Sequence, residues 1–566
     1  MNNFLIFDHF KYQLSNAIQL TQQHSILLND NPSQEKVFEN PGLIMIGDFI
    51  GDVQKLTALR DEKIKDQRGN FYLIETGGEH LRIINSVFSL LPIYYNSDFS
   101  LIGSSLDQIS QLDSANKVNK KFVLECLLFN YGFFNNTLFE GISLLPSNSY
   151  LNIKNNKVSI QKHTDVTSLF QQKNFSSDKK TLAELFINIS KNYFSNENFQ
   201  IAFTGGFDGR TLVSCATHYK CNFETFSFGK PGNSDLDLPK KNAKQLSIPY
   251  RDFVLDGDYV SRFYLDTSKE YIQKSNGGNG FIYSHFLYTT KQLSEKSRVM
   301  LSGYAGSELF RALHIQGAVS SKALVSLFRL DDESEIRAQL KNSPALKYIN
   351  KNEFISELDE LIEEVIQYKK DLPKHLTQNQ KLYTFVFEEI FRKFFGQWTS
   401  LQQNYMHVRT PFLDYKFIEA LLASEYAGAN MDFFTDNPYK RMNGQMVYAA
   451  IIKKTNRIIY EQKTGKGYRP IDLNSKWRLP NLVLPFVIKR FTRKFRKEDL
   501  DNLGIISGVK HHKTELSKFP KTSMFNNEKI NTALDELSSY TPEKDRDALL
   551  MSLSLLFRYE KSNSLN

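Results

Sequence analysis

The pattern of hydrophobic and polar residues changes along the chain. Before about residue 165, short apolar runs alternate with polar turns, as in LIMIGDFI at 43–50, FYLIETG at 71–77 and LRIINSVF at 81–88. Runs of this length, bounded by turn residues, predict β-strands. Beyond about residue 320, apolar residues recur at steps of three and four, as in 354–368 and 382–395. That spacing predicts helices with one buried face.

The segment 201–216 combines both patterns. A strand-like apolar run leads through the turn TGGFD into residues of helical spacing. Gly205 and Gly206 let the backbone adopt positive φ and approach a ligand closely. Amide N–H groups at the start of the helix then favour phosphate oxygens, and Asp208 can hold Mg²⁺ against them. An ordinary glycine turn capped by Asp208 explains the same spacing.

Composition indicates a folded protein with several domain equivalents. The chain has 566 residues, of which 41% are hydrophobic and 13% aromatic, and this excludes a disordered chain. Cys126, Cys215 and Cys221 are too few and too irregularly spaced for a disulfide scaffold or a zinc site, so we expect a reducing compartment and structural roles for all three. The N-terminus lacks the pattern of a signal peptide or a membrane span, and we expect a cytoplasmic protein.

The net charge of +9 is modest, but basic residues concentrate in KRFTRKFRK at 489–497, directly after the apolar run VLPFVI. Such a run suits a phosphorylated substrate, a nucleic acid or an anionic membrane surface, and a solvated helix flank is the alternative. A membrane surface stays open as a partner, whereas nucleic acid is not expected. The sequence sets no oligomeric state. The polar stretch 166–182 is the predicted linker between two domains.

The turn at 204–209 resembles the Ser-Gly-Gly-x-Asp-Ser pyrophosphate loop of the ATP pyrophosphatase fold. Five further segments resemble motifs of the asparagine synthetase B family and follow one another in the same order as in that family. They are LPIYY at 91–95 with IGSS at 102–105, TLFEGI at 137–142 with Leu145 and Pro146, LSGYAGSELF at 301–310, HVRTPFLD at 407–414, and KTG at 463–465. Because five ordered matches are hard to obtain by chance, the chain is identified as similar to this family.

The resemblance implies a fold of the α/β plus α+β class. Residues 1–165 would form a glutaminase-like antiparallel sandwich, and residues 183–566 an ATP pyrophosphatase domain with a parallel sheet and many helices, after the linker at 166–182. The segment TFSFG at 225–229, which contains Ser227, resembles the second strand of the nucleotide-binding sheet. Its backbone is the expected contact for adenine.

The N-terminal half departs from the family where glutamine hydrolysis would occur. Glutamine-dependent members begin with Met and a nucleophilic Cys, whereas this chain has Asn2, whose amide cannot form a thioester. Ile46 stands where the resemblance puts the asparagine of the glutamine pocket. We therefore expect a glutaminase-like domain without glutaminase activity, kept as a scaffold or as a docking surface for a protein partner.

Loss of that nucleophile is typical of relatives that use an amine already present in the substrate. The β-lactam synthetases and the lasso-peptide macrolactam synthetases adenylate a carboxylate and then close an amide. Tyr304 follows Ser302 and Gly303 at the position where the β-lactam enzymes have tyrosine. A phenol held by a carboxylate, with Glu388 or Glu389 as the candidate, can relay the proton that the amine loses. Simple packing is the alternative.

The resemblance also implies an ATP and Mg²⁺ site. Asp208 is the first metal ligand, but Ser307 stands where the family has its second carboxylate, so Glu308 or water would complete the site. Gly209 replaces the last serine of the loop, and Arg210 beside it offers charge to phosphate. The expected nucleotide-binding residues are Thr204, Gly205, Gly206, Asp208, Gly209, Arg210, Ser227 and Gly303.

Two lysines compete for stabilising the charge that develops in the reaction. Lys463 fits the Lys-x-Gly spacing and is slightly favoured, whereas Lys466 precedes Gly467 and Tyr468 as in the Gly-Phe that often follows in the family. A surface location is the alternative for each. Arg409 and Asp414 are expected to act structurally, with the arginine holding carbonyls of the TPFLD loop.

These observations predict an ATP-dependent, AMP-forming amide ligase that adenylates a small-molecule or peptide carboxylate, or a uronic acid, without hydrolysing glutamine. The alternative is a catalytically degenerate family member that acts as an ATP-binding or scaffold protein, because Ser307 and Gly209 depart from the family pattern. A third hypothesis, drawn from the basic run, is an ATP pyrophosphatase that modifies nucleic acid.

Overall fold

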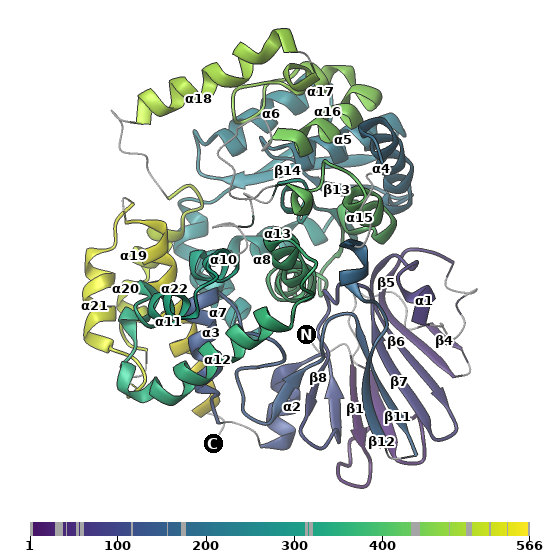
Figure 1. The fold of residues 1–566 in the computed structure, drawn as a ribbon, viewed down its shortest axis with the longest axis vertical. Coiled ribbons are helices and arrows are strands. Elements are labelled where there is room, and N and C mark those ends of the chain that lie inside the picture. The colour runs from purple at the N-terminus through teal and green to yellow at the C-terminus, as the bar shows by residue number, and fades with distance from the viewer. Residues whose placement is uncertain are drawn as a thin grey trace.

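The computed structural model of the chain describes residues 4–28, 38–40, 42–52, 56, 61–114, 117–155, 157–170, 177–311, 315, 321–431, 442–474, 476–493, 501–519, 522–539 and 541–563. In Figure 1 a sandwich of N-terminal strands lies at the lower right, and a parallel sheet with its helices lies above it. The C-terminal helices, in yellow, pack at the lower left.

Two antiparallel sheets form the sandwich in the part of the chain that the structure describes, with the orders β10-β8-β9-β1-β3-β2 and β12-β11-β7-β6-β5-β4. Their inner faces meet in one core that includes Ile6, Ile44, Ile74 and Ile83, as the period of two along each strand requires. The strands are β1 (Phe4–Asp8), β2 (Ile18–Gln19), β3 (His24–Leu28), β4 (Phe38–Asn40), β5 (Leu43–Phe49), β6 (Gly69–Gly77), β7 (His80–Asn85), β8 (Tyr94–Asn96), β9 (Leu101–Gly103), β10 (Ile142–Leu144), β11 (Ser149–Lys154) and β12 (Lys157–Lys162).

The three apolar runs predicted as strands are strands, namely β5, β6 and β7. Ile46 is 2% exposed in β5 and belongs to the sandwich core. Asn2 lies outside the described residues. The predicted linker 166–182 contains the 3₁₀-helix η2 (Val166–Phe170) and the start of α4 (Lys179–Tyr193), and its residues 171–176 also lie outside the described ones.

A five-stranded parallel sheet with the order β15-β14-β13-β16-β17 forms the core of the second half, among the described residues. The runs predicted at 201–203 and 225–229 correspond to β13 (Phe199–Ala202) and β14 (Phe223–Gly229). The other strands are β15 (Tyr250–Val254), β16 (Val299–Leu301) and β17 (His407–Arg409). Because the carboxyl ends of parallel strands meet at one edge, the segments after β13, β14 and β16 lie together. The mixed fold class is confirmed.

Helices cover this sheet and build the remaining volume (Figure 1). They are α5 (Phe207–His218), α6 (Ser234–Leu246), α7 (Tyr264–Lys274), α8 (Gly280–Ser294), α9 (Gly306–Phe310), α10 (Lys322–Arg329), α11 (Glu333–Lys341), α12 (Ile355–Asp371), α15 (Tyr415–Leu422), α16 (Asn443–Thr455), α17 (Arg457–Glu461), α18 (Leu479–Arg493), α19 (Ile505–His511), α20 (Lys513–Leu516), α21 (Asn527–Glu536) and α22 (Glu543–Asn563). Further helices in the described part of the chain include α1 (Asp61–Ile64), α2 (Leu106–Asp113), α3 (Lys120–Phe129) and the π-helix η3 (Tyr259–Phe263).

The predicted helical segment 382–395 differs from a regular α-helix. After α13 (Gln378–Phe385), the chain continues as the π-helix η8 (Val386–Phe395) and then as α14 (Gly396–Gln402). A π-helix of ten residues is unusual, and π-geometry occurs frequently at functional sites. The wider turn changes the direction in which the last residues of η8 project.

The sandwich and the parallel sheet are joined by polar contacts. The Asn70 side chain of β6 donates to the Val408 carbonyl over 2.9 Å, and the Gln403 amide donates to the Asn70 carbonyl over 2.9 Å. Arg68 and Asp414 form an ion pair of 2.6 Å. Arg409 donates to the Tyr193 carbonyl over 3.2 Å, but its main partner is a carboxylate of the sandwich. Arg409 and Asp414 therefore stabilise the contact between the two halves.

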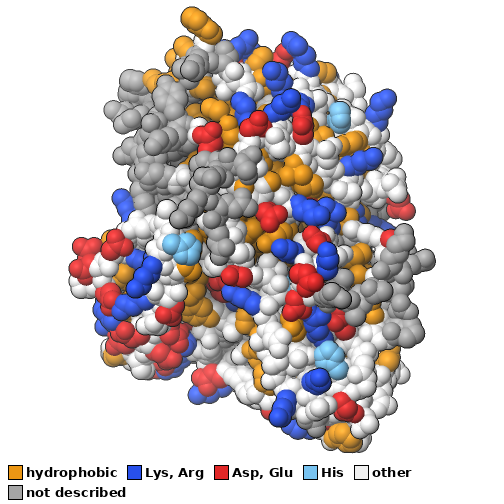
Figure 2. Space-filling view, turned by 45° about the vertical axis from the view of Figure 1, so that its right-hand side comes forward, with side chains coloured by type: hydrophobic (Ala, Val, Ile, Leu, Met, Phe, Trp, Pro, Cys, Tyr) orange, Lys and Arg blue, Asp and Glu red, His pale blue; other side chains and the backbone are white. Residues whose placement is uncertain are grey.

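Other predictions concern surface and compartment. All three cysteines are free thiols. Within the described ranges no helix is long and apolar enough to cross a membrane. Lys/Arg and Asp/Glu side chains are interspersed over the face seen in Figure 2. In the basic run 489–497, residues 494–497 lie outside the described residues, as do the side chains of 489–493, although their backbone belongs to α18.

Candidate functional site

The predicted phosphate loop lies between β13 and α5. Gly206 occupies the N-cap position of α5 without a side-chain cap, so the amide groups of the first turn are left for a ligand. The Thr204 hydroxyl accepts the Gly206 amide over 3.3 Å. A Cβ atom on Gly209 would lie 2.4 Å from the Ala202 carbonyl oxygen. Glycine at 209 therefore lets α5 approach the strand, and no hydroxyl side chain fits there without a shift.

Asp208 is the centre of the polar contacts in the site. One carboxylate oxygen accepts the Tyr448 hydroxyl, and the other accepts the Ser307 hydroxyl over 2.8 Å. Burial raises the pKa of Asp208. The two hydroxyl bonds and the charges of Arg311 and Lys466 lower the pKa, but by less than burial raises it. Ser307, which stands where a second carboxylate was expected, is thus a hydrogen-bond donor to the first.

Glu308 lies beside Asp208 in α9. Burial, together with the negative charge of Asp208, raises the pKa of Glu308 to about 8. A Cβ atom on Gly306 would lie 2.6 Å from an Asp208 oxygen, so the helix start packs directly on this carboxylate. Ala305 has a φ of 65° where the resembled motif has glycine. A left-handed alanine costs conformational energy, and such strain concentrates at functional sites.

Tyr304 follows β16 and faces the same space. Its ring stacks on Phe395 with centroids 5.3 Å apart, and its oxygen accepts the Thr399 hydroxyl over 3.4 Å. Burial raises the pKa of Tyr304 to about 12, while bonds to Thr399 and Asn70 lower it. Neutral groups from α14 and from the sandwich therefore bond to the phenol, and the negative charge of Asp48 in the sandwich also raises its pKa.

The prediction that Glu388 or Glu389 holds the Tyr304 phenol is wrong. Glu388 pairs with Lys162 over 2.6 Å, and Glu389 pairs with Arg392 and Lys393 over 2.7 Å each. Both glutamates belong to η8, and its geometry directs them to these cations. The groups that bond to Tyr304 are Thr399 and Asn70, and the carboxylate whose charge acts on it is Asp48.

The lysine segment contacts the phosphate loop directly. The Gly465 amide donates to the Gly205 carbonyl over 2.9 Å. Both predicted lysines are exposed, and the charge of Lys466 lowers the pKa of Asp208. We therefore take Lys466 as the first candidate for the mutational test, and the choice between the two lysines stays a prediction.

Arg210 has a different location from the one expected. Its side chain is 0% exposed and donates to the Lys463 carbonyl over 2.6 Å. Burial lowers the pKa of Arg210 to about 10. The guanidinium is therefore not part of the cavity lining, because α5 turns it away from the loop. Its hydrogen bond to the Lys463 carbonyl holds the lysine segment in place.

One cavity of about 420 Å³ brings most of the predicted residues together at the carboxyl ends of β13, β14 and β16. Ser227 lines it and shares a hydrogen bond of 2.6 Å with the Tyr250 hydroxyl. The predicted residues along the wall are Thr204, Asp208, Gly209, Ser227, Gly303, Tyr304 and Glu308. Gly205, Gly206, Arg210, Lys463 and Lys466 do not line it, although Gly205 contacts the lysine segment.

Sequence reasoning missed Tyr448 and Arg311, and left Asp235 open between capping the following helix and binding a ligand. Tyr448 of α16 donates to Asp208, Arg311 lowers the pKa of Asp208, and an Asp235 oxygen lies 3.4 Å from the position of a Cβ on Gly205. Asn233 caps α6, which leaves Asp235 in its first turn near the loop. Arg311 directly follows the motif at 301–310, and this adjacency was its only signal.

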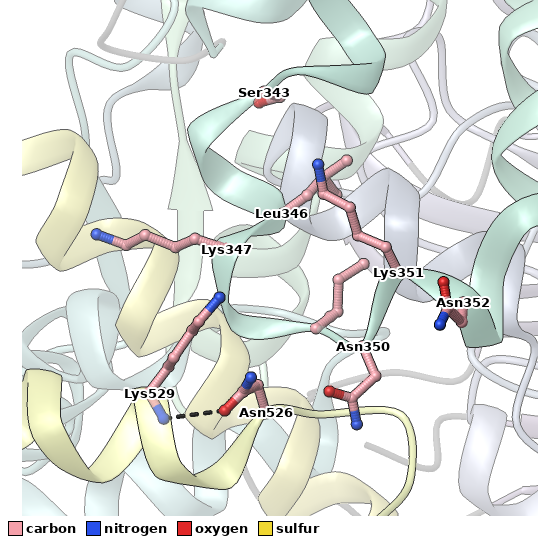
Figure 3. A pocket seen from close by; sticks show the side chains of 9 residues that line it. Ser343, Leu346, Lys347, Asn350, Lys351, Asn352, Asn526 and Lys529 are labelled. Atoms are coloured by element: carbon pink, nitrogen blue, oxygen red, sulfur yellow. Dashed lines mark hydrogen bonds between the residues drawn. The ribbon is translucent and has the colours of Figure 1, made fainter.

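A second cavity, of about 540 Å³, lies between the 3₁₀-helices η6 (Pro344–Tyr348) and η7 (Lys351–Phe354) and helix α21. Figure 3 shows Lys347, Lys351 and Lys529 with asparagine side chains around it. Lys347 pairs with Asp545 over 3.0 Å. Among the described residues that line this cavity there is no carboxylate, thiol or histidine. It therefore lacks groups for adenylation chemistry.

The comparison with known families concerns the half of the chain that holds the first cavity. Residues 189–427 match the asparagine synthase family. This asparagine synthase segment contains β13, β14, β16 and β17 and the residues from Thr204 to Asp414 discussed above. The match supports the resemblance to asparagine synthetases and points to an ATP-dependent ligase that forms C–N bonds. No curated protein matches the chain.

Proposed function

We propose that the protein is an AMP-forming amide ligase that adenylates a carboxylate for attack by an amine or ammonia, without glutamine hydrolysis. The observation that carries this proposal is the single cavity in which Thr204, Asp208, Ser227, Tyr304 and Glu308 converge. It combines a helix N-terminus suited to phosphate with two carboxylates and a phenol.

The first step needs a site for polyphosphate. A substrate carboxylate oxygen attacks the α-phosphorus of ATP, and the bond to pyrophosphate breaks. The uncapped start of α5 and the exposed Lys466 offer N–H donors and positive charge to the pyrophosphate. Both supports lie on segments that the Gly465 to Gly205 bond holds together.

The residues present fit a shared Mg²⁺. Asp208 and Glu308 are the two carboxylates on the cavity wall, and the negative charge of Asp208 raises the pKa of Glu308. Within the described residues no group of three or more His, Cys, Asp or Glu forms a metal cage. Mg²⁺ is commonly held by one or two carboxylates plus substrate phosphates, and when bound it neutralises phosphate charge. Asp208 and Glu308 would be its protein ligands.

In the second step the amine nitrogen attacks the acyl carbon, AMP leaves, and the nitrogen loses a proton. Tyr304 lies on the wall with its phenol near Thr399. It is our candidate to accept a hydrogen bond from the amine and pass on the proton. The burial of Ile46 in the sandwich core, where the resemblance puts the asparagine of the glutamine pocket, supports an amine source other than glutamine.

ATP–pyrophosphate exchange with a panel of carboxylic acids tests this proposal, together with a glutaminase assay. We expect acid-dependent exchange and no release of glutamate from glutamine. The second candidate is an ATP-binding protein without turnover, which the Ser307 bond to Asp208 favours because it occupies a potential metal-binding oxygen. ATP binding without exchange for any acid would select this candidate, and absent ATP binding would reject both.

A further inference from the structure

The cavity beside the phosphate loop has two walls of different chemistry. Its carboxylates, Asp208 and Glu308, come from α5 and α9. The part of the lining that comes from α8, η8 and α14 is aromatic. Its side chains are Tyr283, Phe286, Phe394, Phe395 and Trp398. We call these five residues the aromatic wall.

The aromatic wall is one connected cluster. Phe286 stacks on Trp398 with ring centroids 4.3 Å apart, and Phe394 lies 4.5 Å from Trp398. Phe395 continues the cluster to Tyr304, 5.3 Å away. Aromatic pairs at these separations stabilise one another. The candidate proton relay is thus continuous with an apolar surface.

The π-helix contributes two residues to the aromatic wall. The π-helix η8 ends with Phe394 and Phe395, which both line the cavity. Phe286 and Trp398 are only partly buried although they are large apolar groups at the centre of the domain. Partly exposed aromatic side chains around a concave space are typical of ligand-binding sites.

The five residues of the aromatic wall carry no charge. Among the described residues that line the cavity, none is a lysine or an arginine. Burial lowers the pKa of His285 to about 3, so this histidine is neutral at pH 7. The Gln402 amide is already bonded to Thr290 over 2.7 Å. An additional carboxylate group against this wall would therefore lack a cationic partner, which is costly in a buried site.

We propose that the substrate carboxylate is borne by an uncharged, apolar molecule whose aromatic or aliphatic group lies against Phe286, Phe394 and Trp398. This inference rests on the proposed function and names its substrate class. The carboxylate would face Asp208 and the phosphate loop, and the apolar group would displace water from the aromatic wall. A dicarboxylate such as succinate or aspartate would be disfavoured.

The two tryptophans of the chain allow a direct test of binding. Trp477 is 95% exposed, so the W477F variant leaves Trp398 as the single fluorescent tryptophan. In this variant, titration with 3-phenylpropionate should change Trp398 emission with a Kd at least about tenfold below that of succinate, which carries a second carboxylate in place of the ring. This readout needs no turnover. Equal affinity, or tighter binding of succinate, would overturn the substrate class.

Kinetics separate this inference from the proposed function. In the wild type, 3-phenylpropionate should support exchange with a lower KM than succinate or aspartate. Exchange that prefers aspartate would reject the apolar substrate while leaving the ligase intact. No exchange with any acid would reject the ligase, and the fluorescence titration would still decide on the ligand class.

Variants of Trp398 test whether the aromatic wall holds the acid or the adenine of ATP. W398A should raise the KM for 3-phenylpropionate at least about tenfold and leave the Kd for ATP within about twofold. W398F retains an aromatic ring, so its KM for 3-phenylpropionate should lie close to the wild-type value. It serves as the second variant if W398A does not fold. A raised Kd for ATP with an unchanged KM for the acid would assign the wall to adenine and overturn the proposal.

Discussion

Arg409 binds Asp48 through two parallel hydrogen bonds of 2.7 Å each, and this pair connects the parallel sheet to the sandwich. Burial alone would raise the pKa of Asp48, but the charge and hydrogen bonds of Arg409 lower it overall. Asp48 is 4% exposed. Replacing it leaves a buried guanidinium without its counter-charge.

We therefore expect D48A to lower the free energy of unfolding by about 3–5 kcal/mol, measured by urea denaturation. The Lys117–Glu140 pair, at 2.8 Å with side chains 79% and 45% exposed, provides the control. K117A should cost less than about 1 kcal/mol. Similar losses for both variants would show that the buried pair has no special structural role.

The contacts of Asp208 predict that a substitution at this residue lowers catalytic activity selectively. D208N keeps the shape of the side chain but removes the charge that would hold Mg²⁺ and phosphate, so we expect ATP–pyrophosphate exchange to fall about 100-fold or more. Asp237, exposed in the first turn of α6, provides the matched control. D237N should stay within about twofold of wild type. Retained exchange in D208N would remove Asp208 from the site.

The two lysines should differ although they are three positions apart. K466A should reduce exchange about 100-fold, because Lys466 is the lysine whose charge acts on Asp208. K463A should stay within about threefold, since the Lys463 group that contacts Arg210 is its backbone carbonyl. The measurement is exchange at saturating ATP for both variants. A larger loss of exchange in K463A than in K466A would instead favour Lys463, as the Lys-x-Gly spacing did.

Tyr304 should act after adenylation. Y304F keeps the ring that stacks on Phe395 but loses the hydroxyl group. Exchange should remain within about threefold, whereas amide formation should fall by about 100-fold or more, the usual contribution of a positioned proton-transfer group. Single-turnover assays distinguish the two steps. Equal losses in both steps would indicate that Tyr304 only shapes the cavity.

The buried His163 should make the free energy of unfolding depend on pH. Burial, aided by the charge of Arg82, lowers the pKa of His163 from 6.5 to about 3. Between these values the unfolded chain binds a proton that the folded chain does not, so stability is fully present above pH 6.5 and falls as the pH drops towards 3. From pH 7 to pH 5 this one residue should cost about 2 kcal/mol.

The variant H163Q, which retains a neutral partner for Thr164, isolates this effect. Urea midpoints measured at several pH values should show a shallower decline below pH 6.5 in H163Q than in wild type. At pH 8 histidine is neutral in both states, so there the two proteins should change in parallel with pH. Parallel curves at all pH values would contradict the assignment.

Much of the fold could be predicted from the sequence. The strands β5, β6, β7, β13 and β14 and the helices α5 and α12 coincide with apolar runs of the expected period. The glycine turn after β13 also lies where it was expected, since closely packed glycines leave a strong local signal. Of the regular helix expected at 382–395, residues 386–395 form the π-helix η8 instead, and the periodicity of three and four residues does not distinguish the two geometries.

The partners of the site residues could not be predicted in the same way. Tyr448 and Asp208 are separated by 240 residues, and a tyrosine on a helix leaves no local signal of such a contact. Arg210 stands next to the loop in sequence, yet the turn of α5 buries it against Lys463. Glu389 is directed to Arg392 and Lys393 within its own π-helix rather than to Tyr304.

The sequence by itself therefore predicted the strands and helices named above and the glycine turn between strand and helix, because periodicity and glycine pairs act locally. The tertiary structure alone decided that Arg210 is buried against the lysine segment, which groups bond to Tyr304, and that aromatic side chains line the same cavity as the carboxylates. These features arise where distant segments meet at one edge of the parallel sheet, and neither spacing nor composition records such meetings.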